Sequence, residues 1–146
     1  MGKVVIESKQ FPKVFLRMDG TNVTQFGPGG GTVNCHYEAQ TYEKFELIGQ
    51  ADGTFAIASI KFPGRYLRMD ATNVGGVVNC QFGAWPWEKF YVVPQEEGTV
   101  AFVSQAFPGK YLRMDGTGVT SDKPAGGTVD CASSVSTYVK FKIIPV

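Results

Sequence analysis

Hydrophobic and polar residues alternate in short stretches along the chain, a period typical of strands rather than helices. In the stretch FLRMD at 15–19, Leu and Met share one face, while Phe, Arg and Asp share the other. The stretch YLRMD repeats this order at 66–70 and 111–115. No segment keeps the period of an amphipathic helix, so the pattern predicts an all-β chain whose Leu and Met side chains enter the core.

These stretches belong to a unit that occurs three times. Phe-Pro precedes the Arg of each stretch, and a Cys and then a Phe follow it at corresponding places. The three copies run over about 2–48, 53–93 and 98–144. The second copy lacks the Gly- and Pro-rich loops found at 24–31 and 120–127 in the other two. Because the copies fill the chain, we expect residues 1–146 to form a single domain.

Each copy contains four strand signals separated by turn residues. Between the first two, Phe-Pro-Gly or Phe-Pro-Lys forms a turn in which Pro fixes the backbone and Gly eases the reversal. The expected strands are, in order within the copies, 4–6, 15–19, 33–35 and 44–48; 55–57, 66–70, 77–80 and 89–93; 100–102, 111–115, 128–131 and 140–144. From the fourth strand, Phe45 and Leu47, with Phe90 and Val92, and Phe141 and Ile143, are expected to join the core.

Three four-stranded copies with pseudo-threefold symmetry resemble the β-trefoil superfamily. The resemblance implies that two strands of each copy form a barrel and the other two form a hairpin that caps it. A propeller would need more blades, and a sandwich gives no reason for threefold repetition.

Cysteine occupies the same place in every copy, at Cys35, Cys80 and Cys131, next to Val. Three cysteines cannot all pair within one chain, so we expect small buried hydrophobic residues rather than disulfides. This expectation favours a reducing compartment.

The outward faces of the second and third strands carry the candidate ligand-binding groups. An aromatic ring offers a flat apolar surface, and Arg, Asp and Asn supply donors and acceptors for sugar hydroxyls. The candidates are Arg17, Asp19 and Asn34; Arg68, Asp70 and Asn79; and Arg113, Asp115 and Asp130. A structural alternative stays open, because each Arg could pair with its Asp, and each Asp could cap the turn that follows it.

The residues after Cys differ between copies. His36 and Tyr37 in copy 1, and Gln81 and Phe82 in copy 2, place a polar group beside a ring, whereas copy 3 has Ala132-Ser133. The difference predicts two working sites and one degenerate site. Trp85 has no aromatic counterpart and is a further candidate contact, while Tyr42, Trp87 and Tyr138 are expected to pack structurally.

Composition argues against several functions. The net charge of +1 gives no field that would attract nucleic acid, and no apolar run is long enough to insert into a membrane. One His and three buried Cys do not make a metal site, Glu43 and Glu88 are not placed as a hydrolytic pair, and no cofactor motif occurs. We therefore expect a protein that is not an enzyme. The start MGKVVIESKQ predicts a cytoplasmic protein, or one released without a signal peptide.

Short motifs are similar to several trefoil families. FPGRYLR at 62–68 resembles the arabinose-binding modules, although Met69 stands where they have His, and FPGKYL at 107–112 is similar to fascin-like trefoils. The Gln-x-Trp motif of ricin-type lectins is absent. Two hypotheses follow: a lectin with two or three weak, symmetry-related glycan sites, or a protein-binding trefoil of the fascin type that uses Trp85, Phe26 and Tyr37. The sequence leaves oligomerisation open.

Overall fold

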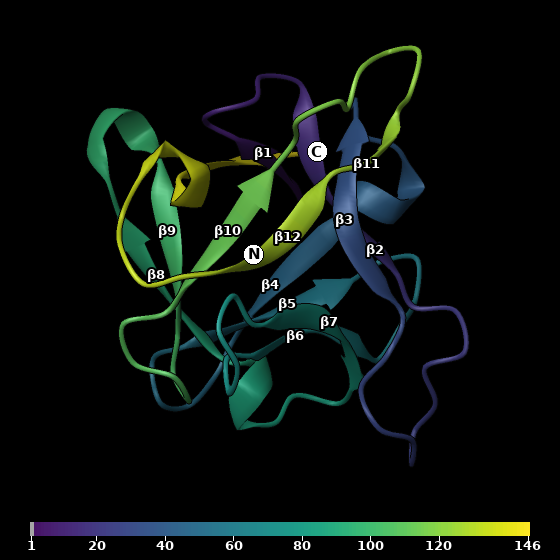
Figure 1. The fold of residues 1–146 in the computed structure, drawn as a ribbon. Coiled ribbons are helices and arrows are strands. Elements are labelled where there is room, and N and C mark those ends of the chain that lie inside the picture. Colours follow the sequence, from purple (N-terminus) through teal and green to yellow (C-terminus); the bar gives the residue numbers. More distant parts are fainter. Residues whose placement is uncertain (1) are drawn as a thin grey trace.

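The computed structural model describes residues 2–146, and in them each copy forms the four strands that the pattern predicts (Figure 1). Copy 1 contains β1 (Lys3–Ser8), β2 (Val14–Asp19), β3 (Thr32–Tyr37) and β4 (Phe45–Gly49). Copy 2 contains β5 (Phe55–Ser59), β6 (Arg65–Asp70), β7 (Val77–Phe82) and β8 (Phe90–Pro94). Copy 3 contains β9 (Val100–Ser104), β10 (Tyr111–Asp115), β12 (Thr128–Ala132) and β13 (Phe141–Pro145). A short additional strand, β11 (Ala125–Gly126), lies in the copy-3 loop.

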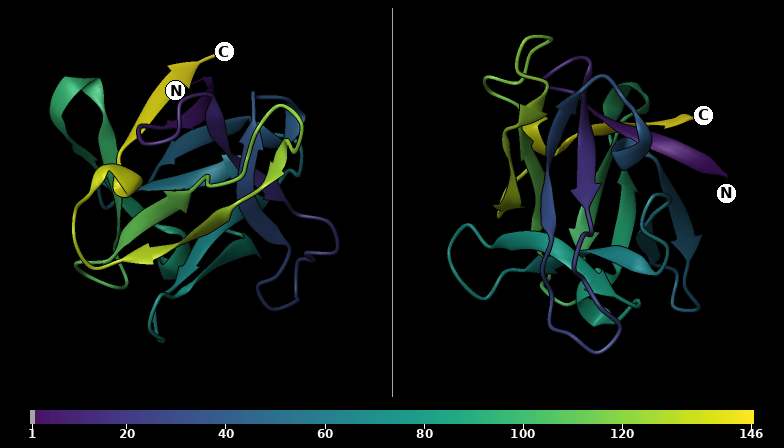
Figure 2. Two further views of the ribbon diagram at one scale, coloured as in Figure 1. Left: turned by 45° about the horizontal axis from the view of Figure 1, so that its top comes forward. Right: turned by 90° about the vertical axis from the view of Figure 1, so that its right-hand side faces the viewer.

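The first and fourth strands of the copies form a closed barrel. The fourth strand of each copy pairs along its length with the first strand of the next: β4 with β5, β8 with β9, and β13 with β1. Shorter pairings within each copy complete the ring. Because β13 pairs with β1, the two ends of the chain lie side by side (Figure 2). Closure leaves no unpaired edge in the barrel.

The second and third strands form three hairpins, β2–β3, β6–β7 and β10–β12, which cap the barrel. Each hairpin joins its barrel strand through a single pairing near the Phe-Pro turn. The three cysteines are buried, unpaired and close to the neighbouring copy: Sγ of Cys80 lies 3.8 Å from the carbonyl oxygen of Asp19. Burial raises the pKa of Cys35 and Cys80 to about 12. The expectation of buried thiols is confirmed.

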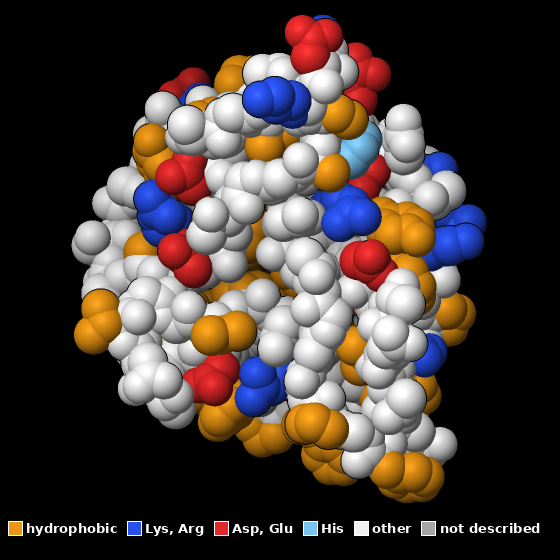
Figure 3. All heavy atoms as spheres, turned by 45° about the vertical axis from the view of Figure 1, so that its right-hand side comes forward, with side chains coloured by type: hydrophobic (Ala, Val, Ile, Leu, Met, Phe, Trp, Pro, Cys, Tyr) orange, Lys and Arg blue, Asp and Glu red, His pale blue; other side chains and the backbone are white. Residues whose placement is uncertain are grey.

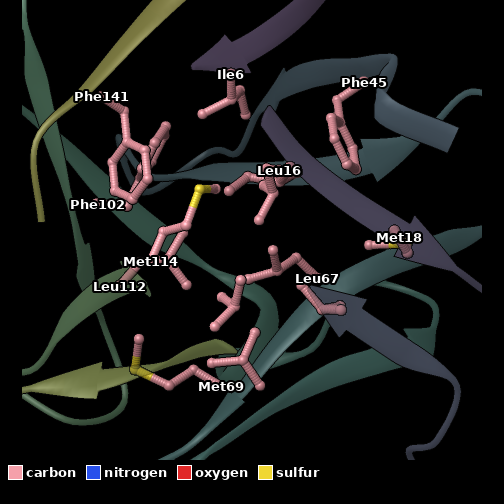
Figure 4. Close-up of a cluster of buried hydrophobic side chains, with 14 of the residues drawn as sticks. Ile6, Leu16, Met18, Phe45, Leu67, Met69, Phe102, Leu112, Met114 and Phe141 are labelled. Carbon is pink, nitrogen blue, oxygen red and sulfur yellow. The ribbon is translucent and has the colours of Figure 1, made fainter. Parts of the chain in front are cut away.

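Leu and Met of the second strands fill the middle of the molecule (Figure 4). Leu16, Met18 and their four counterparts have no exposed surface, and neither do Phe45, Phe90 and Phe141. Each such side chain contributes about 1.5–3 kcal/mol on burial. Val92 and Ile143 were expected in the core, but they are only partly buried and pack against its rim. The corresponding residue of copy 1, Leu47, is buried, so the difference is specific to copies 2 and 3.

The turns repeat as regularly as the strands. Ser8 Oγ accepts the backbone N–H of Phe11 at 2.9 Å, and Ser59 and Ser104 do the same in the other copies. Short 3-10 helices, which sequence periodicity does not reveal, precede the fourth strands: η1 (Thr41–Glu43), η2 (Pro86–Glu88) and η4 (Thr137–Val139), with η3 (Glu96–Gly98) between copies 2 and 3. No helix in residues 2–146 is long and apolar enough to cross a membrane.

Candidate functional site

Copy 1 contains a surface pocket between its hairpin and helix η1. We call it the first pocket; it has a volume of about 260 Å³. Its lining residues are Arg17, His36, Gln40, Thr41, Tyr42 and Glu43. The hairpin supplies the Arg and His, and the helix supplies the remainder, so the pocket exists only because the chain folds η1 back onto β2 and β3.

Copy 2 has a pocket at the corresponding place, the second pocket, with a volume of about 330 Å³. Its lining residues are Arg68, Gln81, Trp85, Pro86, Trp87 and Glu88. Each occupies the position of one first-pocket residue in the repeat. The second pocket is the more apolar of the two, because two Trp and a Pro replace Gln40, Tyr42 and Thr41. Both the polar and the aromatic parts of the site therefore recur by symmetry.

A buried glutamate forms the floor of each pocket. Glu43 and Glu88 each have only 1% of their surface exposed. One oxygen of Glu43 accepts the backbone N–H of Gln40 at 2.7 Å, and Glu88 accepts that of Trp85 at 2.8 Å, which fixes the carboxylates at the start of the 3-10 helices. Desolvation raises the pKa of both carboxyl groups, while these N–H donors and the nearby arginines oppose the shift. A buried acceptor that retains one oxygen for a ligand is thus built into each pocket.

Several neighbours hold the arginine of each pocket. Arg17 Nε lies 3.9 Å from Glu43 Oε2, and Arg17 Nη1 donates to Asn34 Oδ1 at 3.2 Å. The guanidinium also lies over the ring of Tyr42, 5.0 Å from its centroid. In copy 2, Asn79 and Trp87 hold Arg68 in the same way. Asn34 and Asn79, predicted as ligand contacts, therefore orient the arginines and do not line the pockets.

The three aspartates of the second strands cap turns. Asp70 accepts the backbone N–H of Thr72 at 3.0 Å and its hydroxyl at 2.7 Å, and Asp19 and Asp115 accept the same groups of Thr21 and Thr117. These hydrogen bonds lower the pKa of all three aspartates, and the bond from the threonine hydroxyl has the largest effect. Asp70 and Asp115 also lie within 4 Å of the arginine of their own strand. None of the three lines either pocket, so the structural alternative accounts for their repetition.

The remaining candidates divide between pocket and surroundings. His36, Gln81 and Trp85 line the pockets, and Trp85 is 64% exposed. Phe82 lies outside, beneath the guanidinium of Arg65 at 5.0 Å. Tyr37 is half-buried and borders a separate hollow described below.

Copy 3 has exchanged the polar groups of the site. Val139 replaces the buried Glu, Ala132 replaces His36 or Gln81, and Ser136 replaces Gln40 or Trp85. Arg113 lies 3.2 Å from Asp130, so these two candidates form an ion pair. That copy 3 carries a degenerate site stays a prediction.

Glu43, Glu88, Tyr42 and Trp87 were not among the predicted site residues. The sequence holds a signal that could have identified the two glutamates: they are lost in the same copy that loses the His or Gln after Cys. The rings do pack structurally, as expected, since Tyr42 meets Phe62 of the next copy edge-on at 5.2 Å. They line the pockets as well.

In residues 2–146 no group of three or more His, Cys, Asp or Glu is placed to hold a metal ion. Basic and acidic side chains are interspersed on the face that carries the histidine, rather than gathered in a block of one sign (Figure 3).

No family model matches the chain, and no curated protein matches it. Solved structures do. The designed threefold-symmetric protein ThreeFoil matches with a TM-score of 0.76 and 16% identity over 100% of both chains. The fold is a β-trefoil. The trefoil of SeviL bound to asialo-GM1 saccharide matches with a TM-score of 0.73 and 9% identity, over 99% of this chain and 97% of that one.

An exo-β-1,3-galactanase from Clostridium thermocellum matches with a TM-score of 0.80 and 15% identity, over 99% of this chain. The match spans only 30% of the galactanase chain. At such identities the similarity establishes the trefoil fold alone. A protein with a bound saccharide and part of a galactanase chain therefore share this fold.

Proposed function

We propose that this trefoil is a lectin that binds glycans, without catalysis, at the first and second pockets. One observation carries the proposal. Two symmetry-related pockets retain the same combination of a buried Glu, an oriented Arg, a polar side chain from the third strand and an aromatic ring. A purely structural role would place the combination in all three copies, and copy 3 shows that the trefoil forms without it.

The chemistry of the second pocket suits a sugar ring. The Glu88 carboxylate accepts hydroxyl protons, Arg68 donates to hydroxyl oxygens, and Gln81 can do either. Hydrogen bonds to charged groups are stronger than those between neutral groups, and the difference is largest where the acceptor is buried. Trp85 offers an exposed ring against which the C–H face of a pyranose can stack.

The charge of the pockets favours neutral sugars. In each pocket one Arg balances one Glu, so an anionic sugar would find no unpaired cation. Galactosides are suitable first probes, because SeviL was seen with asialo-GM1 saccharide and the Clostridium thermocellum protein is named a galactanase. Shallow pockets of this size predict weak binding, with a Kd on the order of millimolar, or about −4 kcal/mol. Two pockets on one trefoil would raise avidity for a glycan-coated surface.

A glycan array tests the proposal directly. We expect binding of the wild-type protein to neutral glycans and its loss, at least tenfold, in the double variant Glu43→Gln, Glu88→Gln. Glu97→Gln is the matched control, since Glu97 is an exposed carboxylate outside both pockets. Thermal unfolding of each variant separates lost binding from lost folding. A wild-type protein that binds no glycan on the array refutes the proposal.

A protein-binding trefoil is the second candidate, favoured by one specific observation. Phe26 is 94% exposed at the tip of the copy-1 loop, and Val74 is fully exposed in the copy-2 turn, both outside the pockets. Aromatic residues such as Phe are enriched in protein–protein interfaces relative to the rest of the surface. Phe26→Ser should weaken the binding of a captured protein partner without affecting glycan binding. The two Glu→Gln substitutions should weaken glycan binding without affecting the binding of the protein partner.

A further inference from the structure

The two long loops lie on the neighbouring copy, not on their own. In copy 3, β11 pairs with β3 of copy 1, placing Ala125 opposite His36. The backbone N–H of Tyr37 donates to the carbonyl of Pro124 at 2.7 Å. The loop at 120–127 is therefore a structural part of the region around the first pocket.

The copy-1 loop at 24–31 bears the same relation to copy 2. Gly30 and Cys80 exchange both backbone hydrogen bonds, at 2.7 and 2.9 Å. Gln81 Nε2 lies 3.4 Å from the carbonyl of Gly27, and a Cβ on Gly29 would come within 2.8 Å of Arg68 Cδ. This loop thus borders the second pocket through two of the pocket's own residues.

Copy 3 receives only the short turn of copy 2, whose Gly75 carbonyl accepts the N–H of Cys131 at 2.9 Å. The hairpins covered by a long loop are therefore those of copies 1 and 2, which also keep the buried Glu. The hairpin without a long loop is that of copy 3, which has Val139 in its place. A long loop from one copy therefore accompanies a buried Glu in the next copy, which indicates that the loop and the Glu serve one site.

A second hollow adjoins the first pocket where the copy-3 loop at 120–127 crosses copy 1. We call it the loop pocket; it measures about 330 Å³ and is lined by His36, Tyr37, Glu38, Gln40, Ser121 and Pro124. His36 and Gln40 line both pockets, so the two hollows are adjacent. His36 Nδ1 lies 2.8 Å from the carbonyl of Glu38, which can only accept, so Nδ1 carries a proton and donates. Nε2 is then the ring nitrogen left to meet a ligand at the junction.

We propose that the copy-1 site is composite and takes at least a disaccharide. The terminal sugar occupies the first pocket above Glu43, and the next sugar lies in the loop pocket, between Tyr37 and the copy-3 loop. His36 lies at the glycosidic junction and contacts both units. This inference rests on the proposed lectin function, and it makes the loop at 120–127 the element that selects longer glycans.

The test uses the full chain with Glu88→Gln, which disables the second pocket. Its probes are the neutral monosaccharides galactose, glucose, mannose, arabinose and their N-acetylamino forms, each alone and as the terminal unit of disaccharides. Affinities are measured by ¹⁵N NMR titration. Ser121→Trp fills the loop pocket from an exposed position, and Asp122→Trp is the control on the same loop outside the lining.

We expect at least a tenfold preference for one disaccharide over its terminal monosaccharide. Ser121→Trp should reduce that preference below threefold and leave the monosaccharide Kd within twofold, while Asp122→Trp should retain the preference. Equal affinity for both ligands, or a preference that survives Ser121→Trp, overturns the composite site and leaves the lectin proposal standing. If no glycan binds the Glu88→Gln protein or the wild type, the lectin proposal falls and this inference with it.

Discussion

Arg113 Nη1 lies 3.2 Å from Oδ1 of Asp130, the same distance that separates Arg17 from the amide oxygen of Asn34. The two distances are equal, but the acidic partner of the arginine lies on a different element in copy 3. In copies 1 and 2 the acid comes from the 3-10 helix as a buried Glu, and in copy 3 it comes from the strand, while Val139 takes the helix position. Each arginine keeps an acidic neighbour, and the first two arrangements each border a pocket.

This exchange predicts coupling between positions 130 and 139. Asp130→Asn should lower the free energy of unfolding by about 0.5–1 kcal/mol, because it removes the ion-pair partner of Arg113 from a partly exposed site. Val139→Glu alone should cost about 3 kcal/mol or more, since it buries a further acid beside an arginine that already has acidic partners. In the double variant the Glu replaces the lost Asp, so urea denaturation should show a favourable coupling of about 1 kcal/mol. Purely additive effects would contradict the exchange.

Tryptophan fluorescence should report on the second pocket alone. The chain has two Trp, Trp85 and Trp87, and both line that pocket. A glycan that stacks there should change the emission, and Trp85→Ala should abolish the change. Glu43→Gln, in the first pocket, should leave the titration curve as it is. A fluorescence response that depends on Glu43 would show that the two pockets are not independent.

Glycan binding at the second pocket should weaken on acidification. Desolvation raises the pKa of Glu88 above its ordinary value of 4.5, so protonation of the carboxylate begins at a higher pH than for an exposed Glu. Since the neutral acid is a poorer acceptor for sugar hydroxyls, Kd should increase as the pH falls from 7 towards 4.5. Calorimetric titration at several pH values checks this. In Glu88→Gln the residual binding should lack that pH dependence.

Asp70→Ala should lower the free energy of unfolding by about 1 kcal/mol at pH 7, because it removes the cap of the turn at Thr72. The hydrogen bonds lower the pKa of Asp70 below 3.8. Its contribution is therefore present above about pH 4 and is lost as the pH falls through the lowered value. Denaturation midpoints of the two proteins should converge in acid. Loss of glycan binding without loss of stability would restore the ligand role first predicted for this residue.

Lys13 occupies a backbone position that favours glycine. Its φ of 67° corresponds to 81° at Gly64 and 79° at Gly109 in the other copies. Lys13→Gly should raise the free energy of unfolding by about 0.5–1 kcal/mol, through relief of the left-handed strain. Gly64→Ala should lower it by about 1–2 kcal/mol, since the new Cβ would also approach the Phe82 ring to 2.9 Å. Thermal melts of both variants measure the difference, and shifts of the same sign would be inconsistent with this explanation.

The sequence by itself determined the strands, the threefold order and the core. Alternation with period two identifies the buried Leu16 and Met18. A shift of one residue in the assigned alternation would have placed every such side chain on the solvent face. The threefold repetition then indicated that the three equivalent hairpins bury their apolar faces in one pseudo-threefold arrangement. His36, Gln81 and Trp85 could be selected as site residues because they vary between copies that are otherwise alike.

Only the tertiary structure decided which outward groups share a pocket. Asp70 and Glu88 are both acids that recur in the chain. Asp70 turns back onto its own loop, whereas Glu88 of η2 lines the second pocket together with Arg68 of β6. Likewise, the copy-3 loop meets His36 of copy 1 because the hairpins pack in a ring, which brings together residues from opposite ends of the chain. Local periodicity fixes the face of a strand on which a side chain lies, whereas long-range packing fixes what that face meets.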